Sequence, residues 1–304
     1  MKENKEGQSR GFGEKIRRKR ISIPRFLIQT VSFFLIFGGL FGIAATHLIL
    51  PIIAPFGNPY TTVGGAWAFL EITVTAGLFP ALAIAFIVLS SLLVGRLFCA
   101  WVCPLGFIYE VESFFGRKMN VSKYTNKALY KLSLVLAGLF LFIGVSIGYR
   151  EAIGKSIRET FGKMAREPSS IIDPLSTVFS MLFWLFYLEK YPRELADLAT
   201  LPAVFWFRVA FLIISFILSF YVTRGYCRYL CPLGGVMGVA SQYGFLTVYR
   251  DPRKCEKGCR ECEEVCPMGI KLRDYEGRVE DPLCILCGRC IEACPEGAFS
   301  LDFH

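Results

Sequence analysis

The sequence has only two histidines, His47 and His304, and it contains no Cys-x-x-Cys-His motif. Haem is therefore not expected, because neither a bis-histidine pair across a membrane nor a c-type attachment site is available. No Gly-x-Gly-x-x-Gly run follows a strand-like segment, so a dinucleotide cofactor is not indicated either. Charged residues make up only 19% of the chain, which is low for a soluble domain.

Hydrophobic residues are abundant instead, at 54% of the 304 residues, and they gather in long runs. Apolar runs of about 18 residues or more are typical of membrane spans. We therefore expect an α-helical integral membrane protein with four spans, at about 26–50, 81–100, 128–147 and 201–222. Two further apolar segments, 66–78 and 175–188, are too short to span easily and are expected to be half-inserted or interfacial.

The net charge of +9 is unevenly distributed along the chain. Residues 1–25 carry nine Lys/Arg against three Glu, and residues 96–131 carry six against two, whereas 149–200 is balanced. Excess Lys/Arg marks the cytoplasmic side of short loops. This pattern predicts a multi-pass protein of the cell (inner, cytoplasmic) membrane with a cytoplasmic N-terminus. Nucleic acid is not an expected partner, because a basic run beside a span is the ordinary topology signal.

Eight of the twelve cysteines lie in the last sixty residues, in two runs. The runs are Cys255-x3-Cys259-x2-Cys262-x3-Cys266-Pro267 and Cys284-x2-Cys287-x2-Cys290-x3-Cys294-Pro295. Thiolates bind iron strongly, and two-residue gaps let one tight turn supply three corners of a four-iron cubane. Zinc knuckles or disulfides are the alternatives, but zinc sites usually pair two short Cys hairpins without a third cysteine and a Cys-Pro.

This stretch resembles a bacterial-type two-cluster ferredoxin, apart from the three-residue gap after Cys255, which lies beside Gly258. In such ferredoxins the Cys-Pro cysteine of each run ligates the cluster of the other run. The resemblance predicts an α+β domain at 245–304 that holds two [4Fe-4S] clusters. It assigns the first cluster to Cys255, Cys259, Cys262 and Cys294, and the second to Cys284, Cys287, Cys290 and Cys266.

The remaining four cysteines lie in an internal repeat of the form Cys-x3-Cys-Pro-Leu-Gly, at 99–106 and 227–234. Each copy follows a span, a short apolar segment and a second span. Both copies fall on the side predicted to be cytoplasmic. The order predicts two parallel half-repeats, at 23–126 and 127–244, after a basic N-terminal segment at 1–22.

The cysteines of each copy, Cys99 with Cys103 and Cys227 with Cys231, are spaced i,i+4. If the helix continues to the proline, each pair lies on one helical face. A pseudo-twofold axis would then bring the four thiols together as a third redox metal site, of iron–sulfur or simple tetrahedral type. A redox dithiol and ordinary core packing are the alternatives.

Paired Cys-x3-Cys-Pro motifs after membrane helices, followed by two ferredoxin motifs, resemble the NapH, NosR and CcoG membrane polyferredoxins over residues 24–304. NapH- and NosR-type members are associated with passing electrons from membrane quinol toward reductases. CcoG-type members are associated with copper reduction during oxidase assembly. Without a large flavin domain or a further C-terminal domain, the chain is expected to be most similar to the NapH type.

The resemblance implies electron transfer between membrane quinol and a redox partner protein or reductase complex, as in a quinol dehydrogenase-type subunit. A copper-reducing assembly factor and a membrane anchor for a reductase are the alternatives. Quinol oxidation needs an apolar slot, groups that accept protons and a nearby redox centre. The candidates are His47, Glu71 and Arg208, because an ionisable residue within a membrane is a functional hypothesis by default. Structural pairing or snorkelling is the alternative for each, and all three are predicted to lie toward the outside, away from the cysteines.

Overall fold

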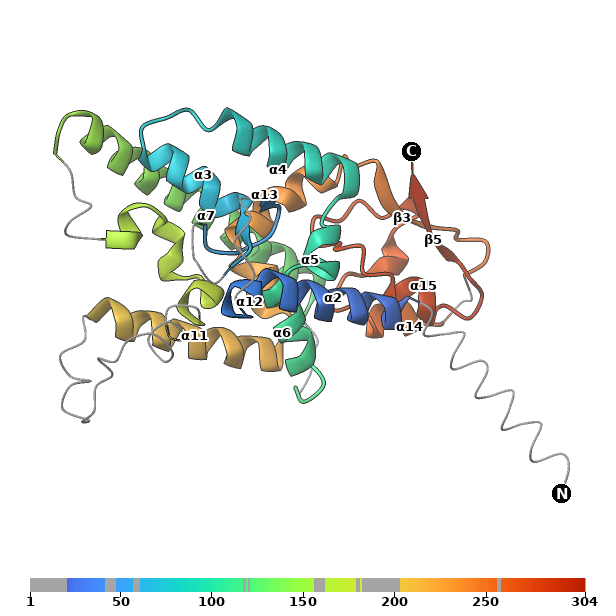
Figure 1. The fold of residues 1–304 in the computed structure, drawn as a ribbon. Coiled ribbons are helices and arrows are strands. Elements are labelled where there is room, and N and C mark those ends of the chain that lie inside the picture. Colours follow the sequence, from blue (N-terminus) through green and yellow to red (C-terminus); the bar gives the residue numbers. More distant parts are fainter. Residues whose placement is uncertain are drawn as a thin grey trace, which may run out of the picture.

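The computed structural model describes residues 21–41, 48–56, 61–116, 119, 121–155, 162–178, 181, 203–255 and 258–303. These residues form a helical region followed by a small α+β domain, which lies at the right of Figure 1 in orange and red. The C-terminus of the chain lies in this small domain (Figure 1).

The first half of the helical region contains α2 (Ser22–Ile36), η1 (Gly38–Phe41), β1 (Leu48–Leu50), β2 (Val63–Gly65), α3 (Ala66–Thr75), α4 (Ala81–Val94), α5 (Leu97–Trp101) and α6 (Pro104–Glu112). Strands β1 and β2 pair in parallel, with Leu48 opposite Val63. The short apolar segment predicted at 66–78 is thus the ten-residue helix α3.

The second half contains α7 (Lys123–Ala152), η2 (Gly162–Ala165), η3 (Pro168–Ile171), α11 (Ala203–Tyr221), α12 (Gly225–Tyr229) and α13 (Pro232–Ser241). Helix α7 begins at Lys123 because the Ser122 hydroxyl accepts a hydrogen bond from the Thr125 N–H at 3.2 Å, which caps the helix. Most of the apolar segment expected at 175–188 lies outside the described residues.

The C-terminal domain contains β3 (Leu246–Arg250), α14 (Glu261–Glu264), η4 (Leu272–Asp274), β4 (Gly277–Arg278), α15 (Arg289–Ala293) and β5 (Phe299–Phe303). Its three strands form an antiparallel sheet in the order β4-β3-β5, with Leu246 opposite Phe303. This is the α+β domain that the resemblance to two-cluster ferredoxins implied.

Among the described residues, α7 and α11 are the two helices that are long and apolar enough to cross a membrane. They coincide with the spans predicted at 128–147 and 201–222. Exposed apolar side chains cover both, including Val135 and Phe142 on α7 and Ile213 and Ile217 on α11. Such contiguous apolar surface is what a helix facing lipid presents.

The prediction of a continuous helix at 26–50 is wrong, because α2 ends at Ile36 and a 3-10 turn begins at Gly38. The helix predicted at 81–100 is also interrupted, because Gly95 takes φ 58 and ends α4 before α5 begins. Helices of 14 and 15 residues rise only about 22 Å, less than a hydrocarbon core of about 30 Å. The described structure therefore supports two of the four predicted spans.

The two halves are interlocked rather than stacked side by side. Helix α2 packs against α5 and α6, and α7 packs equivalently against α12 and α13. The apolar helix of each half crosses to the other, so that α4 packs on α13 and α11 packs on α6. Their shared core includes Ile87, Leu105, Tyr226, Leu233 and Met237. Separating the halves would expose this core, so each cysteine motif is fixed by both.

Candidate iron–sulfur centres

The first ferredoxin cavity is lined by Cys255, Cys259, Cys262 and Cys294, together with Pro295, Glu296 and Phe299. Three of its cysteines come from the segment that leads into α14, and the fourth follows α15. Gly258 lies in the unusual three-residue gap and takes φ 103, a conformation that glycine adopts readily and other residues rarely. Cys255 and Cys259, at the two ends of this gap, both line the cavity.

The second cavity contains Cys266, Cys284, Cys287 and Cys290, within a lining that includes Met268 and Ile270. Two residues of its loop have left-handed backbone, Leu286 at φ 52 and Gly288 at φ 74. These conformations fold the loop around the cavity. The structure therefore groups the eight cysteines as two sets of four, and each set takes its Cys-Pro cysteine from the other run.

Burial raises the pKa of the thiols in both cavities, to about 11 for Cys262 and Cys266 and about 12 for Cys284. A bound metal would offset this cost, because thiols release their protons when they coordinate it. Across the residues that the structure describes, no three Cys, His, Asp or Glu side chains are close enough to hold a single metal ion. In a cubane each of the four irons takes one thiolate as a terminal ligand, so such a cluster needs four separate cysteines around one cavity, as each of these two sets provides.

The membrane-end cysteines occupy two copies of one local structure. Cys99 and Cys227 lie on the five-residue helices α5 and α12, whereas Cys103 and Cys231 are the N-cap residues of α6 and α13. The expectation of one continuous helical face is therefore wrong. The proline after each N-cap cysteine disfavours helical backbone at that cysteine, and both adopt extended conformations.

The structure brings all four membrane-end cysteines together where the half-repeats meet. Cys227 interacts electrostatically with Cys99 and Cys103, and Cys231 interacts with Cys99 and Cys227. Cys103 and Cys231 are both 7% exposed. A parallel repeat with interlocked halves thus gathers thiols that are more than a hundred residues apart in the sequence.

Two buried arginines cross between the half-repeats at this point, and the sequence interpretation did not single them out. Arg224 donates from Nη1 to the Cys99 carbonyl oxygen at 2.8 Å, and Arg96 donates from Nη2 to the Cys227 carbonyl oxygen at 3.2 Å. Each arginine precedes the first cysteine of its own motif by three residues and reaches the first cysteine of the other. The shared position in both copies of the repeat was the available signal.

The proposed quinol-site residues have separate surroundings. The Glu71 carboxylate is buried and accepts hydrogen bonds from Trp67 Nε1 at 3.0 Å and from the Ser169 hydroxyl at 2.9 Å. Arg208 donates to the Ser176 hydroxyl at 3.2 Å and to the Thr177 hydroxyl at 3.3 Å. His47 lies outside the described residues.

A small polar cavity extends from Trp67 toward the second cysteine motif. Its lining includes Glu167, Ser170, Asp173 and Tyr226, and also Pro232, which directly follows Cys231. The Ser170 and Tyr226 hydroxyls are buried and have no hydrogen-bond partner within the described part of the chain. Trp67, which lines this cavity, also donates its indole N–H to Glu71.

A much larger apolar cavity, of about 680 Å³, lies between α3, α4 and α7. Its lining includes Trp67, Leu70, Ile84, Leu141 and Val236. Trp67 therefore borders both the apolar cavity and the polar one. Together the two cavities supply an apolar slot beside buried polar groups and near the cysteines.

Two family models match the chain. One, described as a 4Fe-4S binding domain, matches residues 75–122 and 204–246, and the other, a 4Fe-4S dicluster domain, matches residues 247–296. All twelve cysteines fall within these ranges. No solved structure matches the chain significantly.

Several curated proteins are similar to the chain. An uncharacterized protein of Methanocaldococcus jannaschii is 27% identical over 221 residues, which cover 71% of this chain and 76% of that protein. The ferredoxin-type protein NapH of Escherichia coli is 25% identical over 226 residues, covering 72% and 66%. The regulatory protein NosR of Stutzerimonas stutzeri is 22% identical over 207 residues, covering 66% of this chain and only 24% of NosR. These matches confirm the resemblance to NapH- and NosR-type polyferredoxins. The relatives of this chain include ferredoxin-type and electron-transport proteins, and the chain itself matches two 4Fe-4S family models.

Proposed function

We propose that the chain relays electrons between a membrane donor and a redox partner protein through three centres in series. The observation that carries this proposal is the gathering of twelve cysteines into three sets of four. An iron–sulfur cluster supplies reversible one-electron chemistry when it is bound. The chain supplies the thiolates, excludes water from them and holds the sets next to one another.

In the ferredoxin domain, each centre takes three cysteines from one run and the Cys-Pro cysteine from the other. The grouping around the two cavities supports this crossed assignment. The first centre is held by Cys255, Cys259, Cys262 and Cys294, and the second by Cys266, Cys284, Cys287 and Cys290.

The third centre is held by Cys99, Cys103, Cys227 and Cys231. The 4Fe-4S family model that spans both motifs supports an iron–sulfur identity for it. Arg96 and Arg224 also suit such a centre, because both interact favourably with Cys227 and provide positive charge beside buried thiolates. The centre would join the two half-repeats covalently through its metal, and therefore also stabilise the fold.

The order of the centres follows from the contacts between them. Trp101 lies between Cys99 and Cys103 in the sequence, and its indole Nε1 donates to the Leu286 carbonyl oxygen at 3.2 Å. Leu286 directly precedes Cys287, so the membrane-end centre adjoins the second ferredoxin centre. Cys290 and Cys262 interact electrostatically across the two ferredoxin cavities. Electrons therefore pass between the membrane end and the first centre by way of the second.

The donor that best suits the membrane end is a quinol, which loses two electrons and two protons on oxidation to the quinone. The apolar cavity beside Trp67 suits its ring and tail. The neighbouring polar cavity offers the carboxylates of Glu167 and Asp173 for the protons. Glu71 accepts a hydrogen bond from the Trp67 indole and so helps to hold that ring between the two cavities. Arg208 and His47 are further candidates for the site.

The location that we propose is the cell membrane, with the N-terminus and the ferredoxin domain on the cytoplasmic side. Helices α7 and α11 support insertion, and the Lys/Arg excess of residues 1–25 and 96–131 supports this orientation. The first ferredoxin centre, furthest from the membrane end, then faces the redox partner or reductase complex.

A pair of matched cysteine variants tests the ligand assignment. In anaerobically purified protein reduced with dithionite, Cys266→Ser should alter the electron paramagnetic resonance (EPR) signal of the Cys284/Cys287/Cys290 centre. Cys294→Ser should alter the signal of the other ferredoxin centre. The crossed assignment is wrong if each variant instead affects the centre of its own run.

The donor is tested on the same preparation with a short-chain quinol. We expect the quinol to reduce the centres of the wild-type protein. Reduction by dithionite together with no reduction by any short-chain quinol would contradict a quinol donor, but it would leave the ligand assignment standing.

A further inference from the structure

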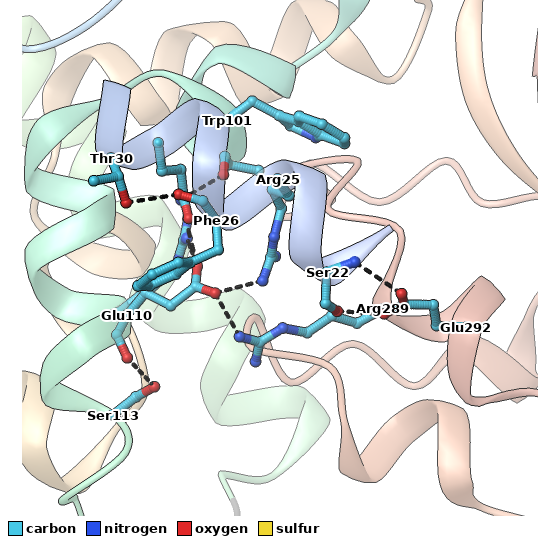
Figure 2. A network of polar contacts seen from close by, with 12 residues as sticks. Ser22, Arg25, Phe26, Thr30, Trp101, Glu110, Ser113, Arg289 and Glu292 are labelled. Atoms are coloured by element: carbon cyan, nitrogen blue, oxygen red, sulfur yellow. Dashed lines mark hydrogen bonds and ion pairs between the residues drawn. The ribbon is translucent and has the colours of Figure 1, made fainter. Parts of the chain in front are cut away.

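Glu110 on α6 is a buried carboxylate on which arginines from three distant segments converge. Arg25 of α2 pairs with its Oε1, which also accepts from Arg289 Nη2 at 2.7 Å, and Arg224 Nη2 donates to Oε2 at 2.6 Å. Figure 2 shows Arg25 reaching Glu110 from α2 and Arg289 reaching it from the ferredoxin domain. We call these four residues the Glu110 cluster.

The Glu110 cluster has a surplus of positive charge. Although burial alone raises the pKa of Glu110, Arg224, Arg289 and Arg25 outweigh it and lower that pKa to about 2. The carboxylate is therefore ionised, and it balances one of the three guanidinium charges. Arg25 and Arg224 are each 1% exposed, so water does little to stabilise the remainder. A buried surplus of this kind is costly unless further negative charge lies nearby.

Arg25 also has unused hydrogen-bonding capacity. Its Nε and Nη1 atoms are buried and find no hydrogen-bond acceptor in the described part of the chain. An orphaned donor on a buried cation is unusual, and it fits a site beside an anionic group that the protein atoms alone do not provide.

The surplus charge faces two of the three cysteine sets. Arg289 lies between Cys287 and Cys290 in the sequence, and Arg25 and Arg224 both interact favourably with Cys287. Arg224 also interacts with Cys227 and bonds the Cys99 carbonyl oxygen. The Glu110 cluster therefore lies between the membrane-end cysteines and the second ferredoxin set.

The first ferredoxin set has the opposite surroundings. Glu296 lines its cavity, and Glu263 interacts unfavourably with Cys262. Arginines therefore lie beside the two inner sets, where Asp281 also interacts with Cys284, whereas glutamates border the outer set.

We propose that the Glu110 cluster raises the reduction potentials of the two inner centres above that of the outer ferredoxin centre. Each reduction adds one negative charge to a centre, and nearby positive charge stabilises the reduced form. Glu110 limits the rise because its own charge opposes the arginines. The inference rests on the proposed function, since it takes the cysteine sets as iron–sulfur ligands.

A redox titration followed by EPR tests this proposal on the full-length, anaerobically purified protein. Glu110→Gln should shift the midpoint potential of the second ferredoxin centre upward, because it removes a negative charge. Arg25→Gln should shift the same potential downward, and Arg25→Lys should leave it close to wild type. The outer ferredoxin centre serves as an internal reference and should not shift in any variant.

A purely structural role for the Glu110 cluster predicts a different pattern. Loosened packing would move the potential in the same direction for Glu110→Gln and Arg25→Gln, or would disturb all the centres together. Either result would overturn the proposal.

A second pair of variants covers the case in which a change at a fully buried residue prevents folding. Arg289 has a side chain that is 19% exposed, so Arg289→Gln and Arg289→Lys are better tolerated. Arg289→Gln should lower the potential and Arg289→Lys should retain it. Equal potentials in both variants would contradict the proposal, whereas failure of quinol reduction alone would count only against the proposed donor.

Discussion

The two half-repeats have the same local structure around their cysteines but different surroundings. Cys103 and Cys231 are equivalent N-cap residues with equal exposure, and Arg96 and Arg224 make equivalent crossed bonds to cysteine carbonyls. The second contacts of the arginines differ. Arg96 donates to the neutral Pro282 carbonyl at 2.8 Å, whereas Arg224 pairs with the Glu110 carboxylate.

This difference separates two tasks. The features shared by both copies form the four-cysteine site, to which each half contributes equally. The features found in one copy connect that site to the ferredoxin domain, because Glu110 and Trp101 of the first half-repeat bond Arg289 and Leu286. The residues that are equivalent in the two half-repeats thus form the four-cysteine site. The residues that differ between them determine which neighbouring centre exchanges electrons with it.

The largest expected effect is a loss of electron transfer that is similar in both half-repeats. Serine replacement of each of the four membrane-end cysteines should nearly abolish electron transfer between a membrane donor and the ferredoxin centres. Stopped-flow absorbance after mixing with quinol measures this transfer. The four losses should be similar, because each cysteine holds one corner of the same site, while dithionite should still reduce both ferredoxin centres. A large loss in one half-repeat only would mean that the motifs are not equivalent.

Arginine variants should reveal the asymmetry. Arg224→Gln removes a hydrogen bond between two charged groups, although Glu110 stays paired with Arg25 and Arg289, whereas Arg96→Gln removes hydrogen bonds from a charged donor to neutral carbonyls. Bonds between two charged groups are the stronger kind, and each loss is worth about 1.5–3 kcal/mol. The thermal midpoint in detergent should therefore fall further for Arg224→Gln. Equal midpoints would indicate that Glu110 contributes little at this position.

The glycines after the prolines offer a finer comparison. A Cβ atom at Gly106 would lie 2.6 Å from the Cys99 carbonyl oxygen, whereas one at Gly234 would lie 2.7 Å from Arg96 Nη2. A side-chain end can move aside more easily than backbone. We expect Gly106→Ala to cost about 1–3 kcal/mol and Gly234→Ala to cost less, as measured by their thermal midpoints. The opposite order would show that Arg96 is held more firmly than the backbone.

The smallest expected effect is the pH dependence of the Glu110 contribution. With its pKa lowered to about 2, Glu110 is ionised in the folded protein throughout the neutral range. Its stabilising ion pairs are fully present above the ordinary carboxyl pKa and are lost only as pH falls through about 2. The potential difference between wild type and Glu110→Gln should therefore be the same at pH 6 and pH 8. A difference that changes between these values would show that Glu110 titrates there.

Local features were readable from the sequence. The ferredoxin cysteines lie close together along the chain, so their spacing was enough to show the resemblance to a two-cluster ferredoxin, and that resemblance implied the α+β domain. Gly258, in the longer gap, has φ 103. Helices α7 and α11 were predicted for the same reason, since a long apolar run needs no distant partner to be recognised.

Features that depend on distant contacts were not readable. Composition predicted two further long helices, but Gly38 and Gly95 lie where the chain turns to pack against other segments. The helical face expected for each membrane-end pair neglected the restriction that a proline places on the preceding residue. Glu110 and its arginines come from four separate segments, and only the fold brings them together.

Both half-repeats are proposed to contribute to one metal centre besides the two ferredoxin clusters. Iron and acid-labile sulfide analysis of anaerobically purified protein, with and without the paired changes Cys99→Ser and Cys227→Ser, tests it most directly. We predict that the wild-type protein holds more than the about eight iron atoms that two cubanes require, and that the double variant retains only those about eight. Equal iron content in the two proteins, with both ferredoxin signals intact, would contradict the claim.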